Sequence, residues 1–160
     1  MKIKVSFVSE MALLEPNLSI VKRLDAIYDL YYITDCRQDI PNKFGIEKVR
    51  RGIKSAVDYE EMTKFSSFLN LKKTYLIYSL TNKSLFNAIK KACDVVRVVR
   101  KLSPDVILTD TTAPYTLLLF LFYYRRIVLL IHDPFPHSGY KQRWFIWFRN
   151  LAFRLVRNKV

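Results

Sequence analysis

The amino-acid sequence predicts an α/β fold in which helices flank a parallel sheet. Its last third alternates helix, strand, helix and strand at residues 83–102, 105–109, 115–124 and 127–131, and short connections of this kind are typical of parallel sheets. The final strand has five consecutive aliphatic residues, which indicates burial on both faces. With 160 residues and 51% hydrophobic composition, the chain is long and apolar enough for the core of one domain.

The first half of the chain shows the same alternation less regularly. Residues 2–8 alternate charged and apolar side chains, which predicts a strand with Ile3, Val5 and Phe7 on one face. Pro16 favours the start of a helix. Leu18, Val21, Leu24 and Ile27 follow at helical spacing, and a second strand is expected at 29–34. Residues 38–59 receive no assignment. A short helix is expected at 60–69, and the segment 74–80 is apolar enough for either a helix or a strand.

The clearest helix spans residues 83–102 and ends at Ser103-Pro104, because the residue before a proline disfavours the helical conformation. Its side chains divide into two stripes. The apolar stripe, expected to face the core, is Leu85, Ile89, Ala92, Val96 and Val99, and the opposite polar stripe is Asn87, Lys90, Asp94, Arg97 and Lys101.

The chain is strongly basic, with 27 Lys and Arg against 14 Asp and Glu and a formal charge of +13. This excess predicts an anionic partner, which is a membrane surface, a nucleic acid, or a phosphorylated or acidic substrate. The first eight residues lack the continuous apolar segment of a secretory signal. The longest apolar run, 115–124, is half the roughly 20 residues of a spanning helix. We expect a cytoplasmic protein in which Cys36 and Cys93, which lack CxxC spacing, are reduced core thiols.

Both histidines of the chain lie in the loop 132–139, directly after the last predicted strand. Ligands of open parallel sheets bind at the carboxyl ends of the strands. An imidazole beside a carboxylate can orient a hydroxyl, accept its proton or hold a leaving phosphate, so His132 and Asp133 are the candidate catalytic residues. Their alternative role is to cap a helix or bond to the backbone. A metal site that adds His137 is a weaker alternative.

Asp110, Thr111 and Thr112 follow the preceding predicted strand and should share this edge of the sheet with His132. A carboxylate with two hydroxyls suits hydrogen bonding to a sugar, which makes these three residues candidate substrate-binding groups. The alternative is an N-cap for the helix that starts at Pro114, because Asp and Thr are favoured there.

Several common nucleotide-binding and hydrolase motifs are missing. The three glycines, Gly45, Gly52 and Gly139, cannot assemble a GxGxxG or a Walker loop. There is no GxSxG sequence and no series of metal ligands. Residues 6–10 contain no glycine, so we expect no close backbone approach to a pyrophosphate there. No cofactor or metal is expected.

The last segment, residues 141–160, carries six Lys or Arg and no acidic residue. On a helix, Arg143, Asn150, Arg154 and Arg157 form one stripe, and Trp144, Phe148, Leu151 and Leu155 form another. This pattern suits an anionic membrane surface, single-stranded nucleic acid through stacking, or a buried helix with solvated arginines. The candidate membrane-binding residues are Arg143, Trp144, Trp147, Arg154 and Arg157.

Two segments carry a family resemblance. The sequence KLSPDVIL at 101–108, followed by an apolar helix, the strand 127–131 and the loop HDPFPHSG at 132–139, resembles the N-terminal domain of retaining GT-B glycosyltransferases of family four. The loop is similar to that of members that build bacterial polysaccharides. The resemblance covers roughly residues 83–157 and, more loosely, the first strand.

The resemblance implies a Rossmann-like domain, the N-terminal half of a GT-B fold, that binds a glycan or lipid-linked acceptor at the inner face of the cell membrane. His132 and Asp133 would face the cleft between domains, and His137 and Ser138 would join the substrate-binding residues. A C-terminal domain would bind the nucleotide sugar. Without that domain, and ending before the last strand of the first, the chain would be a fragment that is not active alone.

This interpretation involves no nucleic acid. It departs from the family in one respect, because the glycine-rich loop usual after the first strand is missing. The alternative function is a non-enzymatic basic α/β module that binds an anionic membrane or a nucleic acid.

Overall fold

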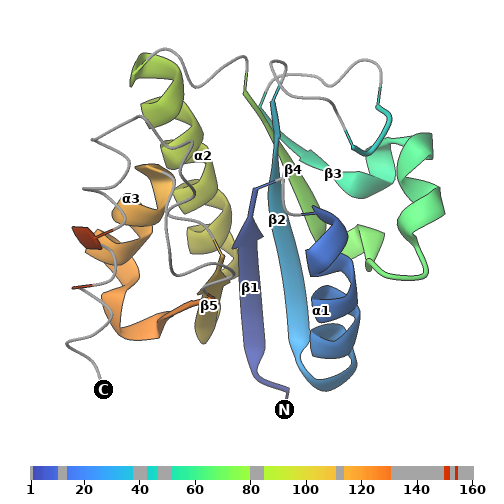
Figure 1. Ribbon diagram of the computed structural model, residues 1–160, viewed down its shortest axis with the longest axis horizontal. Helices are drawn as coiled ribbons and strands as arrows, with labels where there is room; N and C mark the ends of the chain where they lie inside the picture. Colours follow the sequence, from blue (N-terminus) through green and yellow to red (C-terminus); the bar gives the residue numbers. More distant parts are fainter. Residues whose placement is uncertain are drawn as a thin grey trace.

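The computed structural model describes residues 2–10, 14–37, 43–46, 52–79, 85–110 and 114–130, together with Asn150, Leu151 and Arg154. Its strands and helices alternate along the chain (Figure 1). The elements, with η for a 3-10 helix, are β1 (Lys4–Ser9), α1 (Leu14–Ile27), β2 (Asp29–Arg37), β3 (Gly52–Ser55), η2 (Ala56–Asp58), η3 (Glu60–Phe65), η4 (Leu71–Lys73), β4 (Thr74–Ser79), α2 (Leu85–Leu102), β5 (Val106–Thr109), α3 (Pro114–Tyr123), η5 (Tyr124–Arg126) and β6 (Ile127–Leu129).

The described strands form one sheet in the order β3-β4-β2-β1-β5-β6. The central strand β1 pairs in parallel with β2 and with β5. The β2–β4 and β5–β6 pairs are also parallel, whereas β3 runs antiparallel to β4 at one edge. The predicted α/β fold with a parallel sheet flanked by helices is therefore confirmed, and it is Rossmann-like.

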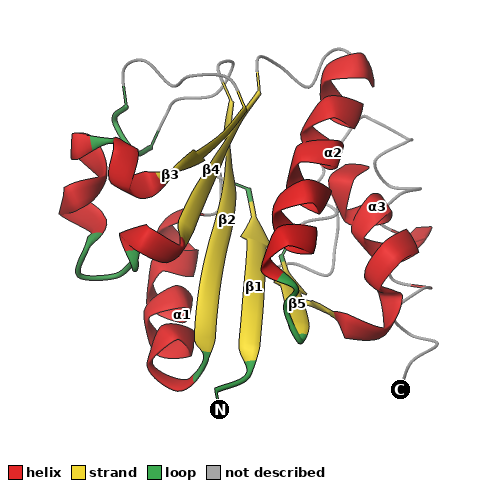
Figure 2. Ribbon diagram, turned by 180° about the vertical axis from the view of Figure 1, so that it is seen from behind, coloured by secondary structure: helices red, strands yellow, loops and turns green. Residues whose placement is uncertain are grey.

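The sheet is covered on both faces. Helix α1 and the 3-10 helices η2, η3 and η4 lie on one side, and α2 and α3 lie on the other (Figures 1 and 2). Phe7 and Tyr32 belong to the core on the α1 side, whereas Val8, Ile33 and Ile107 belong to the core under α2 and α3. Because successive residues of a strand point to opposite faces, both faces of β1 are buried from its second residue onward.

Helix α2 is the predicted helix at 83–102, but its buried face is rotated from the predicted one. Ile89, expected in the core, is 52% exposed, while Lys91 and Asp94 are 2% and 7% exposed. Lys91 takes a core position because its ammonium group pairs with Asp35 of β2. The residues that α2 buries most completely are Ala88, Lys91, Ala92, Asp94, Val95, Val98 and Val99.

Helix α3 leads into β6. The sequence predicts that both faces of this strand are buried, and this prediction is wrong. Ile127 packs in the core with α2 and α3, but Val128 is 52% exposed. In the described sheet β6 pairs with β5 alone, and Val128 points away from the face that α3 covers. None of the described helices combines the length and the apolar character that crossing a bilayer requires.

The expected element boundaries in the first half shift by a few residues. Helix α1 begins at Leu14, before Pro16, and its last residue Ile27 is 62% exposed rather than in the core. The thiol of Cys36 is buried as expected, but Cys93 is exposed, and both are free. Strand β2 extends to Arg37, and β3 and η2 lie within the stretch 38–59 that received no assignment. The helix expected at 60–69 is a 3-10 helix at Glu60–Phe65, and the segment 74–80 contains a strand at Thr74–Ser79.

Candidate functional site

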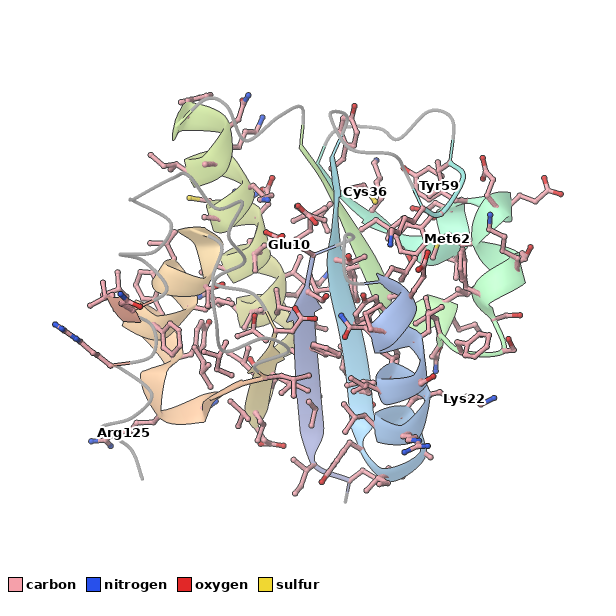
Figure 3. The ribbon with its side chains drawn as sticks, viewed as in Figure 1. Glu10, Lys22, Cys36, Tyr59, Met62 and Arg125 are labelled. Atoms are coloured by element: carbon pink, nitrogen blue, oxygen red, sulfur yellow. The ribbon has the colours of Figure 1, made fainter. Side chains whose placement is uncertain are left out.

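The strand order places a topological switch point between β1 and β5. From β1 the chain continues through α1 on one face of the sheet, and from β5 it continues through α3 on the other. In open α/β sheets this divergence leaves a crevice at the carboxyl ends of the two strands, where ligands bind. Ser9 ends β1 and Asp110 directly follows β5. Glu10 marks this end of β1 near the centre of the molecule (Figure 3).

Three buried polar side chains join at this switch point. Ser9 Oγ donates a hydrogen bond to Asp110 Oδ2 at 2.8 Å. Asn17 Nδ2, from the start of α1, donates to Ser9 Oγ at 2.7 Å and also to Asp110 Oδ2. Ser9 and Asn17 are 1% and 0% exposed, whereas Asp110 is 9% exposed. The Ser9–Asn17–Asp110 cluster therefore fixes a carboxylate in place, and Asp110 is its member nearest to solvent.

The neighbouring strand β2 adds two hydroxyls on the same face as this cluster. Burial, the largest effect, raises the pKa of the Tyr32 phenol, interaction with the Ser9 and Thr34 hydroxyls lowers it, and the carboxylates of Asp110 and Asp35 raise it. The net effect is an increase, so Tyr32 stays protonated and able to donate. The Tyr32 hydroxyl lies near those of Ser9 and Thr34 without full hydrogen-bond geometry, and Thr34 Oγ1 and Asn17 Oδ1 likewise have no partner of full hydrogen-bond geometry among the described residues. Each buried polar atom left unpaired costs about 1–3 kcal/mol, so these atoms favour a polar ligand or ordered water.

A second buried polar group lies on the opposite face of β2. Lys91 Nζ donates to Asp35 Oδ2 at 2.8 Å, and the two side chains are 1% and 4% exposed. Asp35 directly follows Thr34, so the carboxyl end of β2 contributes to both polar groups. The ion pair ties α2 to β2, much as the Ser9–Asn17–Asp110 cluster ties α1 to β1 and β5.

The structure tests part of the sequence-predicted site. Asp110 lies at the carboxyl edge of the sheet as predicted. Its carboxylate accepts from Ser9 and Asn17, and it precedes Pro114, the first described residue of α3, by four positions. Arg154 and Asn150 are exposed and Leu151 is half-buried, as the two predicted stripes require. The predicted site residues that lie outside the described residues are Thr111, Thr112, His132, Asp133, His137, Ser138, Arg143, Trp144, Trp147 and Arg157.

Sequence reasoning missed Ser9, Asn17 and the Lys91–Asp35 pair. One signal was available for Asn17, because it lies at helical spacing between the core residues Leu14 and Val21. A polar residue at such a position is buried and needs a partner. No comparable pattern marks Ser9, whose importance comes from pairing across 101 positions with Asp110.

Comparison with models of known protein families gives no match, and no curated protein shows significant sequence similarity to the chain.

Proposed function

We propose that this chain is the acceptor-binding half of a GT-B glycosyltransferase, which moves a hexose from a nucleotide sugar to a lipid-linked or polysaccharide acceptor. The observation that carries the proposal is the Ser9–Asn17–Asp110 cluster at the switch point of the sheet. A carboxylate held by two donors at the carboxyl ends of parallel strands is suited to accept hydrogen bonds from sugar hydroxyls. The resemblance of residues 101–108 and 127–139 to this family supports the same function.

In this proposal Asp110 positions an acceptor hydroxyl, and His132 and Asp133 carry the chemistry. These two residues follow β6, which is the neighbour of β5 in the sheet. The imidazole of His132 would orient the reacting hydroxyl, accept its proton or hold the leaving phosphate. The nucleotide sugar would bind to a second domain, so the chain alone would transfer no sugar.

A peripheral position at the inner face of the cell membrane belongs to the same proposal. The formal charge of +13 favours an anionic surface. Arg143, Trp144, Trp147, Arg154 and Arg157 are the proposed contacts. The exposure of Arg154 beside the half-buried Leu151 supports an amphipathic helix there.

The test is an acceptor titration of the full-length protein, with radiolabelled nucleotide sugars as donors and membranes of the producing cells as the acceptor source. We expect Asp110→Asn to lower kcat/KM for the acceptor about tenfold or more, because a hydrogen bond to a charged group is lost. The matched control is Asp105→Asn at the opposite end of the same strand, where the exposed carboxylate accepts from the Lys4 backbone at 2.9 Å. Equal effects of the two variants would contradict the proposal.

The net charge also favours the alternative, a non-enzymatic basic module that binds anionic membrane or nucleic acid. The same preparation distinguishes the two functions. Absence of sugar transfer from every donor, together with tighter binding to single-stranded DNA than to anionic liposomes, would favour the alternative.

A further inference from the structure

A small pocket opens on the face of the sheet opposite to the Ser9–Asn17–Asp110 cluster. It has a volume of about 260 Å³ and lies between the C-terminal half of α2 and the strands β3 and β4. In Figure 2, α2 lies on the side of the strands away from α1, and β3 and β4 lie next to each other at the edge of the sheet. The lining residues are Ile53, Tyr75, Arg97, Val98, Lys101 and Leu102.

The pocket exists because the edge of the sheet is only partly covered. Strand β3 has four residues and pairs with β4 alone in the described sheet. The half-buried side chains of Ile53, Tyr75 and Leu102 therefore pack against the core under α2 without being enclosed by it. Together with Val98, which is 4% exposed, they give the pocket apolar walls.

Cationic side chains contribute the polar part of the lining. Lys101 is exposed, and the Arg97 side chain is 72% exposed. Arg97 donates to the carboxylate of Asp94 at 3.1 Å, but a guanidinium has five N–H donors and keeps others available. Apolar walls with a few polar groups that fix orientation are typical of small-molecule sites.

We propose that this pocket binds the alkyl chain of a single-chain anionic amphiphile whose head group meets Lys101 and Arg97. The apolar walls match the chain, and the two cations match the charge of its head. The volume is just below the roughly 300–1,000 Å³ of drug-sized sites, so it suits one alkyl chain rather than a two-chain lipid. The inference is independent of sugar transfer, because the pocket and the Ser9–Asn17–Asp110 cluster lie on opposite faces of the sheet.

The probe is decanoate below its micelle-forming concentration, measured by calorimetry against chain 1–160. We expect one saturable site. Decanol, which lacks the charge, should have an affinity lower by about tenfold or more, as expected for loss of a charge-assisted hydrogen bond. Lack of saturable decanoate binding, or equal affinity for decanol, would overturn the proposal.

Two pairs of variants locate the binding. Ile53→Trp should fill the pocket and abolish binding, whereas Val57→Trp, at an exposed position in a separate pocket beside α1, should not change it. Lys101→Gln should weaken binding about tenfold and Lys101→Glu more. Lys72→Gln and Lys72→Glu, in that separate pocket, should leave it unchanged.

The Lys101 series decides the question if Ile53→Trp does not fold. Equal losses in the Lys101 and Lys72 variants would show that decanoate responds to net charge and not to this pocket. A second measurement compares binding of the protein to phosphatidylcholine vesicles and to fatty-acid vesicles. Equal affinity for the two would likewise exclude recognition of an anionic single-chain amphiphile.

Discussion

The buried pair of Lys91 and Asp35 should be a sensitive point of this fold. Replacing Lys91 with Met keeps the side-chain length but leaves the Asp35 carboxylate, 4% exposed, without its ammonium partner. Removing one member of a buried ion pair typically costs about 3–5 kcal/mol. For a chain of this size each kcal/mol lowers Tm by about 2–4 °C, so Lys91→Met should melt roughly 10 °C below the wild type. The double variant D35L/K91M removes both charges and should regain most of the loss.

The measurement is urea unfolding of chain 1–160 followed by circular dichroism, with the free energy of unfolding as the readout. Lys73→Met is the matched control, because Lys73 Nζ lies 2.7 Å from Asp29 Oδ1, but these side chains are 33% and 29% exposed. Exposed pairs contribute about 0.2–1 kcal/mol. If Lys91→Met cost no more than Lys73→Met, or if the double variant were less stable than both single variants, the reasoning from burial would fail.

Three further predictions follow from the proposed site, the basic tail and the thiols. Under the proposed function, His132→Ala in the full-length protein should lower the turnover of sugar transfer about 100-fold with an unchanged circular dichroism spectrum, and an unchanged rate would remove His132 from the proposed site. Removing three arginines of residues 141–160 should weaken co-sedimentation with anionic liposomes more than removing three cations of residues 83–100, with equal losses indicating diffuse attraction. Cys93 should react with a disulfide reagent in the folded protein and Cys36 only after unfolding, because burial raises the pKa of the Cys36 thiol; fast labelling of both would contradict the buried position of Cys36. The liposome comparison uses R143Q/R154Q/R157Q and K83Q/K90Q/R100Q, which leaves the pocket residue Lys101 unchanged.

The fold was predictable because its main signals are local. Alternating elements with short connections between 83 and 131 give parallel strands almost by necessity, and the observed β5, α3 and β6 lie where that pattern predicts them. Single-sequence periodicity was less reliable for the orientation of α2. Its buried face contains Lys91 and Asp94, which a hydrophobic pattern assigns to solvent. The ion pair between Lys91 and Asp35 of β2 allows Lys91 to be buried.

The candidate site was only partly predictable. Asp110 follows an apolar strand, so its place at the carboxyl edge could be inferred from the sequence. Its partners could not, since Ser9 and Asn17 come from elements more than 90 positions away. Their meeting depends on β5 pairing with β1 rather than with β4, which precedes it in the chain. No local pattern encodes that choice of neighbour.

The two buried polar groups have different consequences for stability and function. Apolar residues at Asn17 and Lys91 would satisfy the helical core pattern at no desolvation cost, yet both positions are polar and both hold a helix to the carboxyl ends of the strands. The Lys91–Asp35 pair is closed to solvent, so its loss should affect stability. Asp110, at 9% exposure, is the least buried member of its cluster at the switch point. Under the proposed function, Asp110→Asn, which keeps the side-chain shape, should therefore weaken acceptor binding more than it lowers the free energy of unfolding. Lys91→Met should instead lower the free energy of unfolding.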